Sequence, residues 1–385
     1  MHVVTLIVGI VIIVVTLADA FEAIILPRRV TRRFRMTRLI IRGLWWVWLM
    51  AVHRLPREGD REGVTFKDRV LGVFGPLMLP FLIIIWAAML IIGFGLVIWA
   101  EGATAVAGHP TTLGIGLYVS GTTFFTLGLG DITPTTTAGR VIMVLEAGTG
   151  FSFLALIIGY IPPIISRFGD RETEITLLDA RAGSPPSAVE LFRRLEGPDC
   201  RETLDRYLRD WERWTATLLE SHLSYPILSY FRSQHERQSW LATLTLILDT
   251  CSLLLVGLED EAGPFSIQQA RLTFAIARHT IGDMAQVLRA PPLTPTEARL
   301  SPEALHLARL LLEDRGIWLR QGGGAERQLA ALRDLYEPHL FALSMYLRVR
   351  LPGWLPDNET PDDWETTAWQ WDRTVVIAAF ERERW

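Results

Sequence analysis

The chain has 385 residues, half of them hydrophobic, and its formal net charge is −4. This charge argues against a nucleic-acid partner, and two cysteines, Cys200 and Cys251, are too few for a disulfide framework. The long apolar runs lie in the first 166 residues, whereas the remainder is charged and interrupted by Pro-Pro and Gly-Gly pairs. A membrane part followed by a larger water-exposed part is therefore expected.

Three stretches are long and apolar enough to cross a membrane, which takes about 20 residues. They cover residues 3–26, 71–100 and 138–165. The stretch 39–52 is shorter, contains Arg42 and holds three tryptophans, a composition typical of the membrane interface rather than of a fourth span. Ala18-Asp19-Ala20 resembles a signal-peptidase site, but the arginines that follow favour a retained anchor.

Basic residues predict the orientation of the spans. Arginines are dense directly after the first span and before the second, and neither Lys nor Arg occurs between Arg69 and Arg140. The positive-inside rule then places residues 28–70 and 167–385 in the cytoplasm, and the amino terminus and residues 101–137 outside. The cell membrane is the expected location.

The basic residues at 28–42 also predict a contact with lipid. They are expected to bind anionic headgroups, and Asp19 and Glu22 are expected to pair with one of the first members of the cluster, Arg28, Arg29 or Arg32. Some of these arginines recur at every third position, as the arginines of a voltage-sensing helix do. Such a sensor needs three preceding helices, and only one is available. The members with this spacing are Arg29, Arg32, Arg35 and Arg38.

Between the second and third spans the sequence reads TTFFTLGLGDITP from Thr122. The residues just before it are moderately apolar and too short to cross, so a re-entrant helix is expected. Irregular backbone at membrane depth is tolerated where it is buried in protein or lines a wet cavity. Alternating glycines, Gly128 and Gly130, allow successive carbonyls to face one axis, where they can replace the hydration shell of a cation. A plain tight turn is the alternative, and it leaves Thr126 and Asp131 unexplained.

This arrangement resembles the pore module of potassium channels over about residues 70–166. The usual filter reads Thr-Val-Gly-Tyr-Gly-Asp, and Leu127 and Leu129 replace its Val and Tyr. The resemblance implies K⁺ as the permeant ion with no other cofactor, and a homotetramer, because one chain supplies one loop and a filter needs four. The implied filter residues are Thr126, Leu127, Gly128, Leu129, Gly130 and Asp131; the first four would bind K⁺ and Asp131 would lie at the outer mouth.

Two alternatives to a potassium channel stay open. The tyrosine hydroxyl that usually braces the filter is missing at Leu129, which leaves a poorly selective cation channel. A membrane-anchored signalling or scaffold protein that does not conduct is the other alternative. No catalytic signature is present, so an enzyme is not expected.

The third span carries candidate gating residues. Gly148 and Gly150 lie just below the filter, where a hinge is implied by the resemblance, and Pro162-Pro163 should kink or end the helix. Glu146 is a carboxylate within the span, and it either contacts the pore helix or faces the pore.

The polar part is expected to be helical. Its apolar spacing predicts helices over 187–196, 201–222, 236–258, 266–289, 302–319 and 325–349, without strands. Asp249 favours a core helix over a fourth span at 240–258, and Gly322-Gly323-Gly324 is expected to be a turn, not a nucleotide-binding loop. No metal site is expected at three isolated histidines, His222, His235 and His279. The segment SHLSYPILSYFRSQ at 221–234 has no role that the sequence reveals.

The prediction is thus an all-α membrane protein. It consists of an extra transmembrane helix (1–27), a basic juxtamembrane segment (28–69), a pore domain (70–166) with outer helix, re-entrant helix and inner helix, and a helical cytoplasmic regulatory and assembly domain (167–385). Gating by the last domain is expected, and the ligand that would act on it is not identifiable from the sequence.

Overall fold

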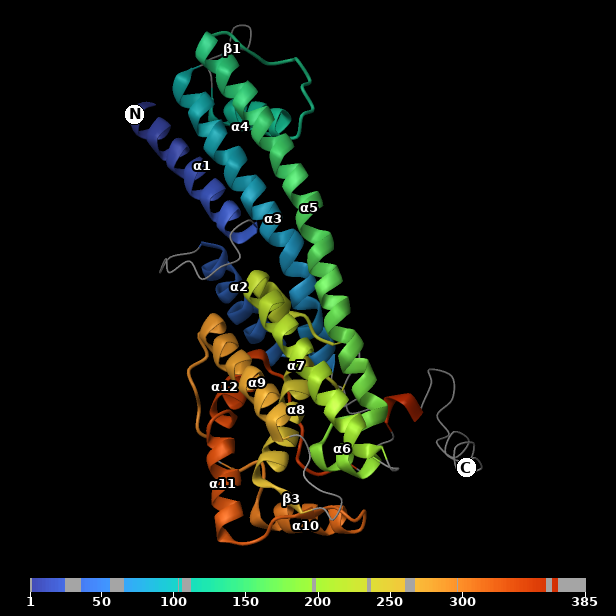
Figure 1. Cartoon of the computed structure of the whole chain (residues 1–385). Coiled ribbons are helices and arrows are strands. Elements are labelled where there is room, and N and C mark those ends of the chain that lie inside the picture. Colours follow the sequence, from blue (N-terminus) through green and yellow to red (C-terminus); the bar gives the residue numbers. More distant parts are fainter. Residues whose placement is uncertain are drawn as a thin grey trace. The chain divides into compact units, whose positions relative to one another are not determined.

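The computed structural model describes residues 2–24, 36–55, 66–102, 104–105, 112–195, 199–233, 237–259, 267–295, 297–357 and 362–365. They form twelve α-helices, two 3-10 helices and two ladders of two-residue strands (Figure 1). The expected all-α membrane protein is confirmed. Among the described residues, three helices are long and apolar enough to cross a membrane: α1 (His2–Ile24), α3 (Phe66–Glu101) and α5 (Thr137–Ala182).

Packing divides the chain into two units. Unit 1 comprises Met1–Ser166 and Ile227–Phe231, and unit 2 comprises Arg167–Pro226 and Arg232–Trp385. Unit 1 contains α1, α2 (Met36–His53), α3, α4 (Leu113–Phe124) and the first part of α5. In the same unit β1 (Thr104–Ala105) pairs antiparallel with β2 (Thr133–Pro134), so that the residues before α4 are tied to those after the TLGLGD loop.

The first span packs on α3 through two glycines. A Cβ added to Gly9 would lie 2.7 Å from the carbonyl oxygen of Gly93, and a Cβ added to Gly93 would lie 3.2 Å from that of Gly9. Small residues at such a crossing let two backbones approach closely, which is a common way for helices to associate in a membrane. The span α1 is therefore part of the packed unit.

Asp19 at the end of α1 joins three helices. Its carboxylate accepts a hydrogen bond from the amide of Thr37 in the first turn of α2, 3.1 Å away, and another from the Thr37 hydroxyl. The indole Nε1 of Trp86 on α3 donates to the same carboxylate at 3.0 Å. Asp19 thus stabilises the start of α2, as an acid at a helix N-terminus does. The expected arginine partners lie outside the described residues.

The inner helix is longer than the sequence predicts. Pro162 and Pro163 both lie inside α5, which continues to Ala182. The prolines leave the carbonyls of residues 158 and 159 without their helical amide donors, yet the helix does not end there. A helix end at the prolines is therefore a wrong expectation, and their gating role stays a prediction.

Unit 2 is a helical bundle around α8 (Trp240–Val256), of which every residue except Leu255 is buried. This burial is that of a core helix, as Asp249 indicates. It packs against α6 (Ala188–Arg194), α9 (Ile267–Leu288), α11 (Gly323–Asp334) and α12 (Glu337–Leu347). The other described helices of unit 2 include α7 (Cys200–Ser224), α10 (Pro302–Glu313) and the short η2 (Asp363–Glu365).

Four expectations for this part are corrected. The helix predicted over 302–319 ends at Glu313, because β4 (Trp318–Leu319) pairs with β3 (Leu258–Glu259) as a short ladder, so strands do occur. The helix predicted over 325–349 is two helices that meet near Tyr336. Of the three glycines, only Gly322 is a turn residue, with φ +97°, and α11 begins at Gly323.

His222 lies in the interior of unit 2. Burial, together with the neighbouring Arg171 guanidinium, lowers the pKa of His222 to about 3. Its Nδ1 lies 2.8 Å from the carbonyl oxygen of Leu218. The imidazole is therefore neutral near pH 7, which is the behaviour of a core residue.

Candidate ion-conduction site

The re-entrant helix α4 is held against α3 by a second pair of glycines. A Cβ on Gly116 would lie 2.6 Å from the carbonyl oxygen of Gly95, and one on Gly95 would lie 2.8 Å from Leu117 Cδ2. At its start, the hydroxyl of Thr112 accepts a hydrogen bond from the Ile115 amide at 3.4 Å. Close packing on α3 and a capped N-terminus fix the position of α4, and therefore the position at which the loop after it begins.

A buried polar contact joins α4 to the inner helix. The hydroxyl of Ser120 is hydrogen-bonded both to the Glu146 carboxylate on α5 and to the carbonyl oxygen of Ile91, the latter at 2.8 Å. Glu146 is fully buried. Of the two roles that the sequence leaves open for Glu146, the structure supports the contact with the pore helix.

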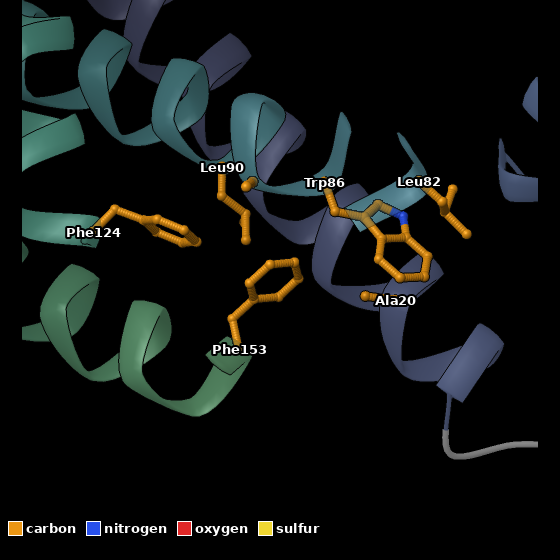
Figure 2. Close-up of a cluster of buried hydrophobic side chains, with 7 residues drawn as sticks. Ala20, Leu82, Trp86, Leu90, Phe124 and Phe153 are labelled. Atoms are coloured by element: carbon orange, nitrogen blue, oxygen red, sulfur yellow. The ribbon is translucent and has the colours of Figure 1, made fainter. Parts of the chain in front are cut away.

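An apolar cluster includes the last residue of α4 (Figure 2). Phe124 at the end of α4 packs against Phe153 of α5, with ring centroids 5.7 Å apart, and Leu90 and Trp86 of α3 complete the layer (Figure 2). Buried aromatic rings contribute large apolar areas. The end of α4 is thus fixed by both α3 and α5.

The loop after α4 has an alternating backbone. Thr126, Gly128 and Gly130 have φ values of +54°, +54° and +78°. The two leucines between them do not have a positive φ. The loop starts tightly, because the amide of Leu127 donates to the carbonyl oxygen of Thr122 at 2.8 Å. In the single chain, residues 125–131 are all exposed.

Tyr118 braces the end of this loop that follows Gly130. Its hydroxyl donates to the carboxylate of Asp131 at 2.8 Å, from α4 across to the residue that follows Gly130. Tyr118 was not predicted, because the resemblance to potassium channels places the bracing hydroxyl at position 129, where this chain has leucine. The sequence feature that could have predicted this brace is a tyrosine in the N-terminal half of the predicted re-entrant helix, the half beside which the residues after the loop are expected to pass.

The structure brings some predicted residues together and separates others. Residues 126–131 form one continuous loop at the end of α4. Gly150 lies beside that end, because a Cβ there would be 2.0 Å from the carbonyl oxygen of Phe124, whereas a Cβ on Gly148 would meet nothing within 4 Å. Pro162 and Pro163 lie three turns further along α5. Among the described residues, no group of three His, Cys, Asp or Glu could hold a metal ion.

The contact at Gly150 predicts a stability effect. Gly150→Ala would force α5 away from α4, and such overpacking costs about 1–3 kcal/mol. We expect the melting temperature of the protein in detergent to fall by about 3–10 °C. Gly148→Ala is the matched control on the same helix and should leave it unchanged. Equal melting temperatures for the two variants would show that Gly150 is not a packing residue.

A capped re-entrant helix between two candidate spans, followed by a loop with alternating φ, defines the pore module of an ion channel. Comparison with protein families agrees. Residues 81–166, which run from α3 through α4 and the loop into α5, match the family described as "Ion channel". This segment is thus similar to the pore segment of two-transmembrane ion channels.

A curated relative extends the likeness beyond the pore. The chain is 20% identical over 231 residues to the protein named "Uncharacterized membrane protein YdjJ" of Bacillus subtilis (strain 168). The match covers 59% of this chain and 64% of that protein, so the chain spans slightly less than two thirds of the relative's length. No solved structure matches the chain.

Proposed function

We propose that the protein is a homotetrameric channel that conducts K⁺ passively and selectively across the cell membrane. The observation that carries the proposal is the alternation of φ at Thr126, Gly128 and Gly130. When every second residue of a loop is left-handed, successive carbonyls can face the same side, and four such loops can surround a dehydrated cation. One chain supplies one loop, hence four chains.

The filter residues have distinct proposed roles. Thr126 contributes its hydroxyl and carbonyl, and Leu127, Gly128 and Leu129 contribute carbonyls. Gly130 continues the alternation. Asp131 lies at the mouth, where a carboxylate raises the local cation concentration.

The bond from Tyr118 to Asp131 favours potassium selectivity over poor selectivity. A braced filter holds its oxygens at a fixed spacing, and the hydroxyl that is missing at Leu129 is supplied from α4 at 2.8 Å. Both parts of the bond belong to one chain, so each of the four loops would have its own brace.

The orientation and the lipid contact are also part of the proposal. By the positive-inside rule, unit 2 would lie in the cytoplasm and regulate the pore through α5, with bending at Gly148 or Gly150 and at Pro162-Pro163. The helix α2 would lie in the interface: Leu39, Trp46 and Val47 are each more than half exposed, and the opposite Trp45 is buried. Of the cluster at 28–42, residues 36–42 are described, and they begin this helix.

The test is an ion flux assay on purified protein in liposomes, run with opposing K⁺ and Na⁺ gradients. We expect a barium-sensitive flux and a reversal potential close to the potassium equilibrium potential. A reversal potential near zero would indicate a poorly selective cation channel. No flux from protein that is folded and tetrameric would favour a non-conducting signalling or scaffold protein.

A further inference from the structure

The segment at 221–234 acquires a position that its sequence does not reveal. Most of its residues belong to unit 2, but Ile227–Phe231 pack within unit 1. The 3-10 helix η1 (Pro226–Tyr230) covers nearly all of this stretch. The chain therefore leaves unit 2 for five residues and then returns. We call residues 227–231 the docking segment.

An aromatic site on α2 and α3 receives the docking segment. The ring centroid of Tyr230 lies 5.3 Å from that of Trp45 and 5.4 Å from that of Phe74, and the last two rings are 4.7 Å apart. Interactions of this geometry stabilise a contact beyond the area that it buries. Every residue of the docking segment is less than one tenth exposed.

A glycine of α3 makes room for the backbone of the docking segment. A Cβ added to Gly75 would lie 2.8 Å from the carbonyl carbon and oxygen of Tyr230 and 2.8 Å from Cδ2 of Phe231. Contacts of this length do not occur with real Cβ atoms. The contact therefore requires glycine at position 75.

The turn of α3 that receives the docking segment is weak as a helix. Gly75 is followed by Pro76 and, four residues later, by Pro80, both inside α3. Each proline removes one amide donor, and glycine adds backbone freedom. A helix bends most readily at such a point. The docking segment thus lies on a turn of the outer helix that bends more readily than a turn without glycine and proline.

We propose that the docking segment is the element through which unit 2 sets the position of the outer helix α3. Further along, α3 carries Gly95, which contacts Gly116 of the pore helix α4. A bend or shift of α3 at Gly75-Pro76 therefore reaches α4 directly. In a channel, release of the docking segment would change the open probability and leave ion preference unaltered. This functional part rests on the proposed function.

The docking itself can be tested without conduction. Gly75→Ala should displace the docking segment, whereas Gly43→Ala, on α2, adds the same methyl where nothing lies within 4 Å. Hydrogen exchange of the full-length tetramer in nanodiscs should show the amides of residues 227–231 exchanging at least about tenfold faster in the first variant than in the second. Tyr230→Ala, which removes the ring without changing α3, should give the same result. Equal exchange in all three variants and the wild type would refute the docking.

The coupling is tested by single-channel recording of the same variants. We expect Gly75→Ala and Tyr230→Ala to change the open probability at least about threefold, with the reversal potential of the wild type, and Gly43→Ala to change neither. Faster exchange with an unchanged open probability would refute the coupling. If the wild type carries no current, the proposed function fails, and the exchange rates alone decide the docking.

Discussion

Gly128→Ala is expected to abolish potassium conduction. Gly128 has φ +54°, a left-handed conformation that costs an L-residue with a side chain about 1–2 kcal/mol. Four copies in one filter would cost about 4–8 kcal/mol together, which lowers the population of the conducting loop by more than about 100-fold. The measurement is potassium flux per tetramer in liposomes.

The fold should survive this change. A Cβ on Gly128 meets nothing within 4 Å of its own chain, so the single subunit has room for it. Gly128→Ala should therefore elute from a sizing column at the volume of the wild type, in the proposed tetrameric state. Gly282→Ala on α9, which also adds a methyl to open space, is the control and should conduct normally. Wild-type current from Gly128→Ala would end the assignment of this loop as the filter.

Arg299→Met is expected to produce the largest loss of stability in unit 2. The guanidinium is buried and binds two carboxylates, with Nη2 2.6 Å from Asp249 and Nη1 3.2 Å from Glu337. Tyr336 also donates to Asp249, at 2.7 Å. Methionine fills a similar volume but leaves the buried Asp249 without its cation, whereas Glu337 keeps its pair with Arg333, 3.1 Å away. Removing one partner of a buried ion pair costs about 3–5 kcal/mol.

Hydrogen exchange of the α8 amides measures this loss, because these amides open only when the core of unit 2 opens. Arg209→Met is the control. Arg209 pairs with Asp205 on the surface of α7, its side chain is 53% exposed, and the change should cost less than about 1 kcal/mol. Similar exchange in the two variants would mean that the buried network does not stabilise unit 2.

Features that depend on neighbouring residues could be predicted from the sequence. The three candidate spans follow from runs of apolar residues, and the re-entrant helix follows from an apolar stretch too short to cross. The loop at 126–131 follows from the glycine alternation. Asp249 marked α8 as a core helix, because a carboxylate in an apolar run needs a buried partner.

Features that depend on distant partners could not be predicted. Nothing in the sequence pairs Asp249 with Arg299, 50 residues later, or Asp19 with Trp86, 67 residues later. Tyr118 is 13 residues from Asp131, but only the path of the loop brings them together. The end of a helix at Pro162-Pro163 was a reasonable expectation from local rules, yet α5 continues through both prolines to Ala182.

The two glycines of α3 limit how this helix can move. Gly93 meets α1 and Gly95 meets α4, and residues two apart on a helix point to nearly opposite sides, about 200° around the axis. Rotation of α3 about its own axis would bring larger side chains into its contacts with both α1 and α4 at once. Sliding α3 along its axis would also move both glycines off their contacts, so tilting is the freedom that remains, and any signal carried by this helix must be a lever stroke and not a twist.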